Sequence, residues 1–119
     1  MIDTPRGRRV GERLLISGEV HVPHLVTIET TSVIRKWSLS HQIDARLARR
    51  ALVDLADFAA VRHPHEPYLE RAWELRDNVS AYDAIYVALA EALDAALMTC
   101  DARLARAPLA GMRIDLIRP

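Results

Sequence analysis

The stretch that decides the fold runs from residue 76 to residue 104 and reads RDNVSAYDAIYVALAEALDAALMTCDARL. Its first half predicts a nearly uncharged helix over residues 81–94 that Ser80 begins, and its second half predicts a short strand over residues 96–99. Because residues 84–90 carry no charge, the helix is expected to be buried on almost all sides. One aspartate follows each start signal, Asp83 in the helix and Asp101 after the strand.

Around this stretch the sequence alternates between helices and short strands. The pattern predicts a helix from Thr4 that Ser17-Gly18 ends, a strand over 19–23, helices over 24–38 and about 43–55, a weak strand over 58–61, a helix over 66–76 and a strand over 113–117. Among the side chains expected to point inward are Leu52, Leu69 and Trp73. Such alternation predicts a single α/β domain over residues 1–119, with three layers (α/β/α) and a short, mainly parallel sheet.

Composition excludes several classes of function. The chain has 119 residues, enough for one domain with a sizeable core, and its 16 basic residues balance its 16 acidic residues. No global field therefore favours nucleic acid, and affinity for RNA requires a local patch or a bound metal. One cysteine excludes an internal disulfide, and no apolar run is long enough to span a bilayer. Without a recognisable signal peptide, a cytoplasmic location with no membrane association is expected.

Three carboxylates are candidates for chemistry, and each also has a purely structural interpretation. Glu29 interrupts the apolar stripe of its predicted helix, where it either serves a function or escapes to solvent or to an arginine. Asp83 stands three residues after Ser80, as in a capping box, but it also places an acid at the start of a buried helix. Asp101 either caps the next helix or lies at the carboxyl end of a strand, where open parallel sheets bind ligands.

Several segments of the sequence resemble a known family. The run from Trp73 to Glu91, the segment Leu97–Asp101 and the segment Pro23–Glu29 resemble the VapC toxins, which are PIN-domain endoribonucleases of type II toxin–antitoxin pairs. The core Tyr-Asp-Ala-x-Tyr-Val-Ala-Leu-Ala is specific to that family, and the resemblance covers the chain from about Thr4 to its end. It implies a PIN-like three-layer fold and metal-dependent hydrolysis of RNA.

The resemblance also implies a set of site residues. In the family, carboxylates hold one or two Mg²⁺ or Mn²⁺ ions, which activate a water for attack on the phosphodiester. Matching positions assign Glu29, Asp83 and Asp101 as three of the four catalytic and metal-binding acids. Thr99 would support the site by orienting a carboxylate or a metal-bound water, although it can also be an ordinary strand residue.

The beginning of the chain departs from the family pattern. VapC chains normally start with a hydrophobic strand that supplies the first metal-binding aspartate, whereas Met1–Val10 resembles the region after that strand. Asp3 is followed by Thr-Pro-Arg, which favours a loop. The N-terminal strand and its acid are therefore expected to be missing, through a misassigned start codon or genuine decay. Ribonuclease activity is expected to be weak or absent unless a partner strand fills the gap.

The resemblance implies partners as well: an RNA substrate, a VapB-like antitoxin that places an arginine near the acids, and a second copy of the chain in a homodimer. The alternative function is that of a non-catalytic PIN remnant that binds an antitoxin or another protein. A basic group, Arg46, Arg49 and Arg50, can grip RNA phosphates, contact an antitoxin or simply be solvated. Two histidine pairs, His21 with His24 and His63 with His65, could suggest a zinc site. Neither pair has the further cysteine or histidine ligands that a closed zinc site needs, so these histidines are expected to lie in turns.

Overall fold

A computed structural model describes residues 15–16, 19–99, 106 and 114–116 of the chain, with only the backbone described at 15–16, 98–99 and 114–116. The strands are β1 (Leu15–Ile16), β2 (Glu19–Pro23), β3 (Val61–His63), β4 (Leu97–Thr99) and β5 (Ile114–Leu116). The helices are α2 (Leu25–Leu39), α3 (Ala45–Asp57), the 3₁₀ turn η1 (Glu66–Tyr68), α4 (Leu69–Glu74) and α5 (Ala81–Ala92). The order is that of an α/β protein.

The described strands form two short sheets. In the first, β2 lies between β1 and β3, antiparallel to β1 and parallel to β3, with Pro23 opposite His63 at the end of the pairing. In the second, β4 and β5 run parallel, with Leu97 opposite Ile114. The prediction of a short, mainly parallel sheet is therefore confirmed.

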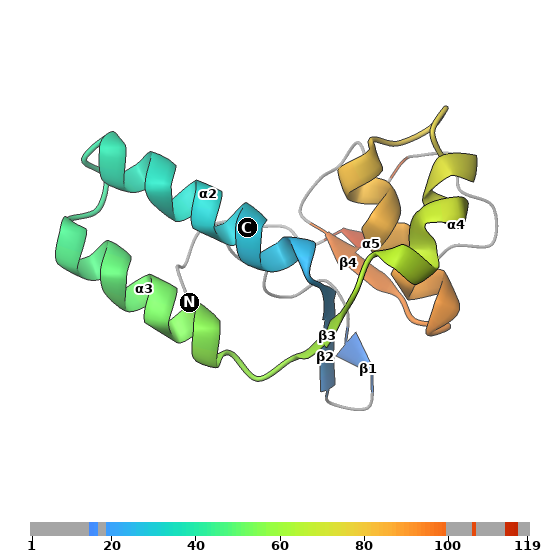
Figure 1. Cartoon of the computed structure of the whole chain (residues 1–119), viewed down its shortest axis with the longest axis horizontal. Helices are drawn as coiled ribbons and strands as arrows, with labels where there is room; N and C mark the ends of the chain where they lie inside the picture. The colour runs from blue at the N-terminus through green and yellow to red at the C-terminus, as the bar shows by residue number, and fades with distance from the viewer. Residues whose placement is uncertain (1–14, 17–18, 100–105, 107–113, 117–119) are drawn as a thin grey trace.

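The helices lie on both sides of these strands (Figure 1). Helices α2 and α3 form a long antiparallel hairpin on one side of β2 and β3, while α4 and α5 pack together on the other side (Figure 1). None of the helices in the described ranges combines the length and apolar character needed to cross a membrane.

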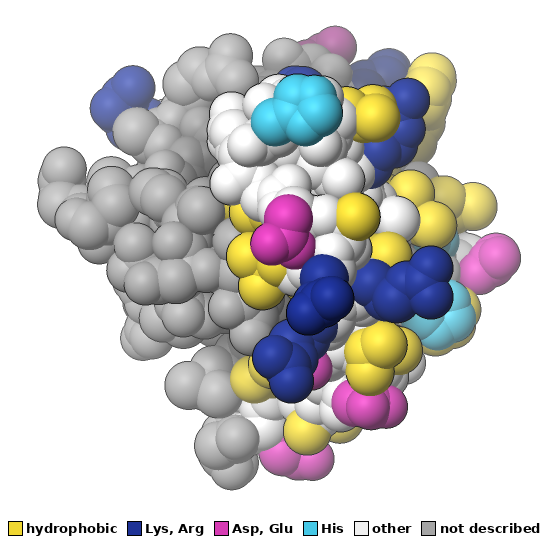
Figure 2. Space-filling model, turned by 90° about the vertical axis from the view of Figure 1, so that its left-hand side faces the viewer, with side chains coloured by type: hydrophobic (Ala, Val, Ile, Leu, Met, Phe, Trp, Pro, Cys, Tyr) yellow, Lys and Arg dark blue, Asp and Glu magenta, His cyan; other side chains and the backbone are white. Residues whose placement is uncertain are grey.

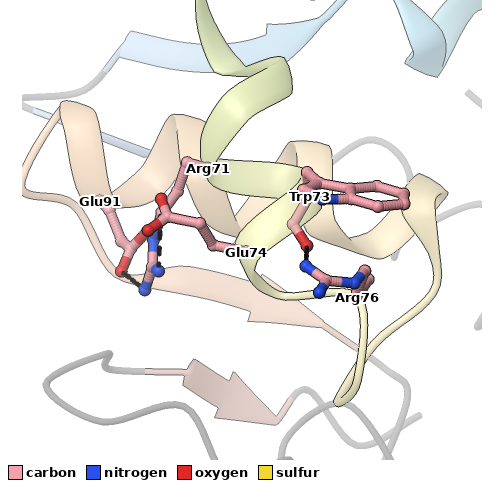
Figure 3. A network of polar contacts seen from close by, with 5 residues as sticks. All are labelled: Arg71, Trp73, Glu74, Arg76 and Glu91. Carbon is pink, nitrogen blue, oxygen red and sulfur yellow. Dashed lines mark hydrogen bonds and ion pairs between the residues drawn. The ribbon is translucent and has the colours of Figure 1, made fainter.

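Helix α5 is the centre of the larger core. All seven residues from Ala84 to Ala90 are buried, and Tyr86 and Leu89 have no exposed surface. Leu75 and Leu97 complete this core, with Leu25 from the start of α2 packed against it. On the outer side, Arg71 of α4 donates two hydrogen bonds of 2.8 and 3.0 Å to the Glu91 carboxylate of α5 (Figure 3). These bonds raise the pKa of Arg71 and join the two helices at their surface.

Several local predictions need correction. Leu15 lies in a strand and not in a helix, and the strand predicted over 58–61 occurs at Val61–His63. Leu52, Leu69 and Trp73 were expected inside, but they are exposed to 39%, 55% and 67% respectively. Trp73 instead has the guanidinium of Arg76 over its ring, 4.5 Å from the centroid (Figure 3). These three apolar side chains fit the helical period, yet a large part of each stays exposed to solvent.

Candidate active site

Glu29 projects from the second turn of α2 and contacts helix α5. Its side chain is half-buried, and its Oε1 atom accepts a hydrogen bond of 2.5 Å from the hydroxyl of Tyr86. Tyr86 itself is fully buried, so its ring fixes the position of the hydroxyl. The partner of this Glu29 oxygen is therefore neither solvent nor an arginine. It is the buried phenol of Tyr86, which orients the oxygen from α5.

Asp83 lies in the first turn of the same helix α5. The hydroxyl oxygen of Ser80 accepts a hydrogen bond of 3.2 Å from the Asp83 backbone N–H, which confirms Ser80 as the residue that caps this helix. The Asp83 side chain is half-buried and takes part in further interactions of its own. Because Tyr86 follows Asp83 by three residues, both lie on one side of α5. Glu29 is thus bound to the side of α5 that carries Asp83.

The other two predicted site residues cannot be placed in the same way. Asp101 lies outside the described residues, and Thr99 is described only as the last backbone position of β4. Within the described ranges, no three His, Cys, Asp or Glu side chains form a group that could hold a metal ion. All four predicted site residues therefore stay predictions, and Glu29, Tyr86 and Asp83 form the part of the candidate site that the structure describes.

Tyr86 is the residue that sequence reasoning missed. It belongs to the motif that resembles the family, but the motif alone assigns it no role. The available signal was its place in the uncharged helix, because a fully buried tyrosine hydroxyl usually has a hydrogen-bond partner. That signal indicates a partner but not its identity, and Glu29 is 57 residues away in the sequence.

The histidines, interpreted as turn residues, gather where β2, α2 and β3 meet. The Nδ1 atom of His21 lies 3.0 Å from Nε2 of His63, and the two rings stack with centroids 5.3 Å apart. His24 and His65 form a second pair, tilted, with centroids 6.2 Å apart. Burial lowers the pKa of His63 below its ordinary 6.5, and the positive charges that His21 and His24 can carry lower it further.

The predicted basic group is exposed on α3. Arg46, Arg49 and Arg50 all face solvent. Figure 2 shows Lys and Arg side chains beside hydrophobic ones on the face where the free end of the α2–α3 hairpin points to the viewer. The exposure is compatible with each of the three interpretations of this group.

Comparison with known proteins identifies the family. The family model of the PIN domain matches residues 2–109. Over 93 residues the chain is 50% identical to Ribonuclease VapC9 of Mycobacterium tuberculosis, covering 77% of this chain and 73% of the relative. It is 46% identical over 99 residues to Ribonuclease VapC1 of the same organism, covering 82% and 74%, and 35% identical over 118 residues to its Ribonuclease VapC12, covering 98% and 90%. The chain therefore belongs to the PIN-domain family, in its VapC group.

Proposed function

We propose that this protein is the toxin of a VapBC-type toxin–antitoxin pair and acts as an endoribonuclease that hydrolyses RNA phosphodiester bonds with Mg²⁺ or Mn²⁺. The family supports the activity, since the relatives at 46–50% identity are named ribonucleases. Those names also favour the enzyme over the alternative of a non-catalytic remnant. In the structure, the proposal rests on one observation: the hydrogen bond from Tyr86 brings Glu29 to the side of α5 that carries Asp83.

The chemistry of these residues fits a hard divalent cation. Both candidate ligands are carboxylates, and both are half-buried and therefore open to solvent on one side. Among the described residues, Tyr86 hydrogen-bonds to Oε1 of Glu29, and the second oxygen of Glu29 is the one proposed as a ligand. Mg²⁺ binds oxygen ligands and keeps several waters, so two or three carboxylates are enough. Glu29 and Asp83 would hold the ion, together with Asp101 from beyond the end of β4.

A bound divalent ion supplies Lewis acidity, which lowers the pKa of a water and neutralises charge on the phosphate. The protein residues supply the positioning. Tyr86 limits the rotation of the Glu29 carboxylate, and the Ser80 cap fixes the backbone from which Asp83 projects. In the proposed site Thr99 orients an acidic side chain or a water through its hydroxyl.

Two partners belong to this proposal. RNA is the substrate, and a VapB-like antitoxin is the inhibitor. An antitoxin arginine placed at Glu29 and Asp83 would neutralise the same charges as the metal, because guanidinium forms strong paired hydrogen bonds with carboxylates. We also propose a homodimer as the form in which the toxin acts.

Isosteric removal of the charges tests the site. We expect Glu29→Gln and Asp83→Asn each to reduce Mn²⁺-dependent cleavage of RNA at least about 100-fold and to abolish the rise in melting temperature on addition of Mn²⁺. Glu70→Gln is the matched control, because Glu70 is an exposed acid in the first turn of α4. The proposal fails if the folded Glu29 and Asp83 variants cleave RNA as fast as the control does.

A further inference from the structure

The four histidines near the start of α2 carry an inference that goes beyond the proposed function. We propose that the histidine junction, defined as His21, His24, His63 and His65, holds helix α2 in place through uncharged imidazoles. Because α2 carries Glu29, the junction would position that carboxylate and loosen it as the pH falls. Only the consequence for RNA cleavage rests on the proposed function.

Helix α2 has an unusual cap. The first N–H groups of a helix lack intrahelical partners, and a side chain next to them in sequence usually supplies one. His24 precedes α2 but its side chain makes no capping hydrogen bond. Instead, the N–H of Leu25 donates a hydrogen bond of 2.9 Å to Nε2 of His65, 40 residues away. His65 is therefore the cap of a helix that belongs to a different part of the sequence.

Two further contacts connect the end of β2 and the start of α2 to β3. The N–H of His24 donates to the carbonyl oxygen of His63 at 2.8 Å, directly after the last pairing of β2 with β3. The rings of His21 and His63 join the two strands by their contact of 3.0 Å. The start of α2 is thus attached to β3 and to the residues that follow it.

These contacts limit the number of protons that the imidazole rings of the junction can carry. Nε2 of His65 accepts from Leu25 only while it carries no proton itself. One of the two nitrogens in the His21–His63 contact must also be unprotonated, so this pair holds at most one positive charge. A proton on His65 would also place a positive charge at the amino end of α2, where the helix dipole disfavours it.

Three other charged residues that the structure describes lie near the histidine junction. Glu19 lies 4.0 Å from Nε2 of His21. A positive charge on His21 alone would still leave Nε2 of His63 free to accept in their contact. The guanidinium of Arg62 is directed away, because it donates to the carbonyl oxygens of Phe58 and Leu55. Glu66 follows His65 at the start of η1 and is exposed.

The lowered pKa of His63 gives the direction of the pH effect. Burial is its largest cause, followed by the charges on His21 and His24. A histidine whose folded-state pKa is depressed binds a proton more readily in the unfolded chain. Its contribution to stability is therefore complete above the ordinary value of 6.5 and is lost as the pH falls below it.

The test follows the amide of Leu25 by NMR hydrogen exchange, corrected for the intrinsic rate, between about pH 8 and about pH 5. In the unaltered protein we expect protection of this amide to fall about fivefold over that range, the usual effect of a lost cap. The ¹⁵N shifts of the His65 ring at the upper pH should show a proton on Nδ1 and none on Nε2.

Two variants make the result specific. His65→Gln keeps an acceptor that does not titrate, so the Leu25 amide should stay protected over the whole pH range. His65→Ala removes the acceptor, so protection of that amide should be low at every pH. His41→Asn is the control, since His41 lies in the turn between α2 and α3 at a φ of 60° that asparagine tolerates. It should behave as the unaltered protein does.

The inference is overturned if protection of Leu25 does not change with pH in the unaltered protein, or if His65→Gln keeps the full pH dependence. RNA cleavage over the same range is a separate measurement, in which His65→Gln should retain more activity at low pH than the unaltered protein does. If exchange behaves as expected but no variant cleaves RNA, the junction stands and the proposed function fails.

Discussion

Helix α5 and the α2–α3 hairpin differ in how the fold holds them. Seven consecutive residues of α5 are buried, from Ala84 to Ala90, so neighbours surround this helix on nearly every side. In α3 only Ala48, Ala51 and Leu55 are buried, and the outer surface of the hairpin carries exposed residues such as Leu39, Leu47 and Val53. Core packing surrounds α5, whereas α2 combines one buried stripe (Val26, Thr30, Val33 and Ile34) with polar contacts at its start. The candidate site joins these two kinds of helix.

The largest expected effect tests the packing side of this comparison. Leu89→Ala in α5 should lower the free energy of unfolding by about 2 to 5 kcal/mol, because Leu89 has no exposed surface and its loss leaves a cavity. Leu47→Ala in α3 removes the same atoms at a site that is 49% exposed, and its cost should stay within about 0.5 kcal/mol. Urea unfolding of both variants measures the difference. Equal losses would mean that the two helices are not held differently.

A smaller effect tests the link between the two regions. Tyr86→Phe removes only the hydroxyl that binds Glu29, and water can replace it at the half-buried carboxylate, so the free energy of unfolding should fall by about 1 kcal/mol. Cleavage of RNA should fall about tenfold, because Glu29 loses its orientation. Tyr82→Phe is the matched control on the same helix, since Tyr82 is 64% exposed. Cleavage and Mn²⁺ affinity equal to those of the control would contradict a positioning role for Tyr86.

Local sequence signals were sufficient for much of the fold. The predicted strand at 19–23, the helices at 24–38 and 81–94 and the strand at 96–99 agree with the structure within a few residues, and the Ser80 cap is confirmed. Each of these depends on hydrophobic period or on capping, which neighbouring residues determine. Glu29 was singled out for the same reason, because a carboxylate interrupted an apolar stripe.

The contacts that join distant segments could not be predicted in this way. Tyr86 and Glu29 are 57 residues apart, and His21 and His63 are 42 apart. A periodic pattern shows which side of an element is apolar, but it does not show which element covers it. Trp73 failed for that reason: its spacing fitted a core position, yet it lies on the outer surface of α4. The histidines show the same limit: His24 and His65 lie in a turn and a bend as predicted, but His21 and His63 lie in strands, and their pairing across the sheet was not predicted.

The proposed function requires that carboxylates from α2 and α5 hold one divalent ion. The most direct measurement is a crystal structure of the protein grown with Mn²⁺, in which anomalous scattering locates the metal. We predict a peak within coordination distance of both Glu29 and Asp83, with Tyr86 still bonded to Glu29. A peak at other residues, or Glu29 and Asp83 pointing to different sides of the molecule at saturating Mn²⁺, would contradict the account.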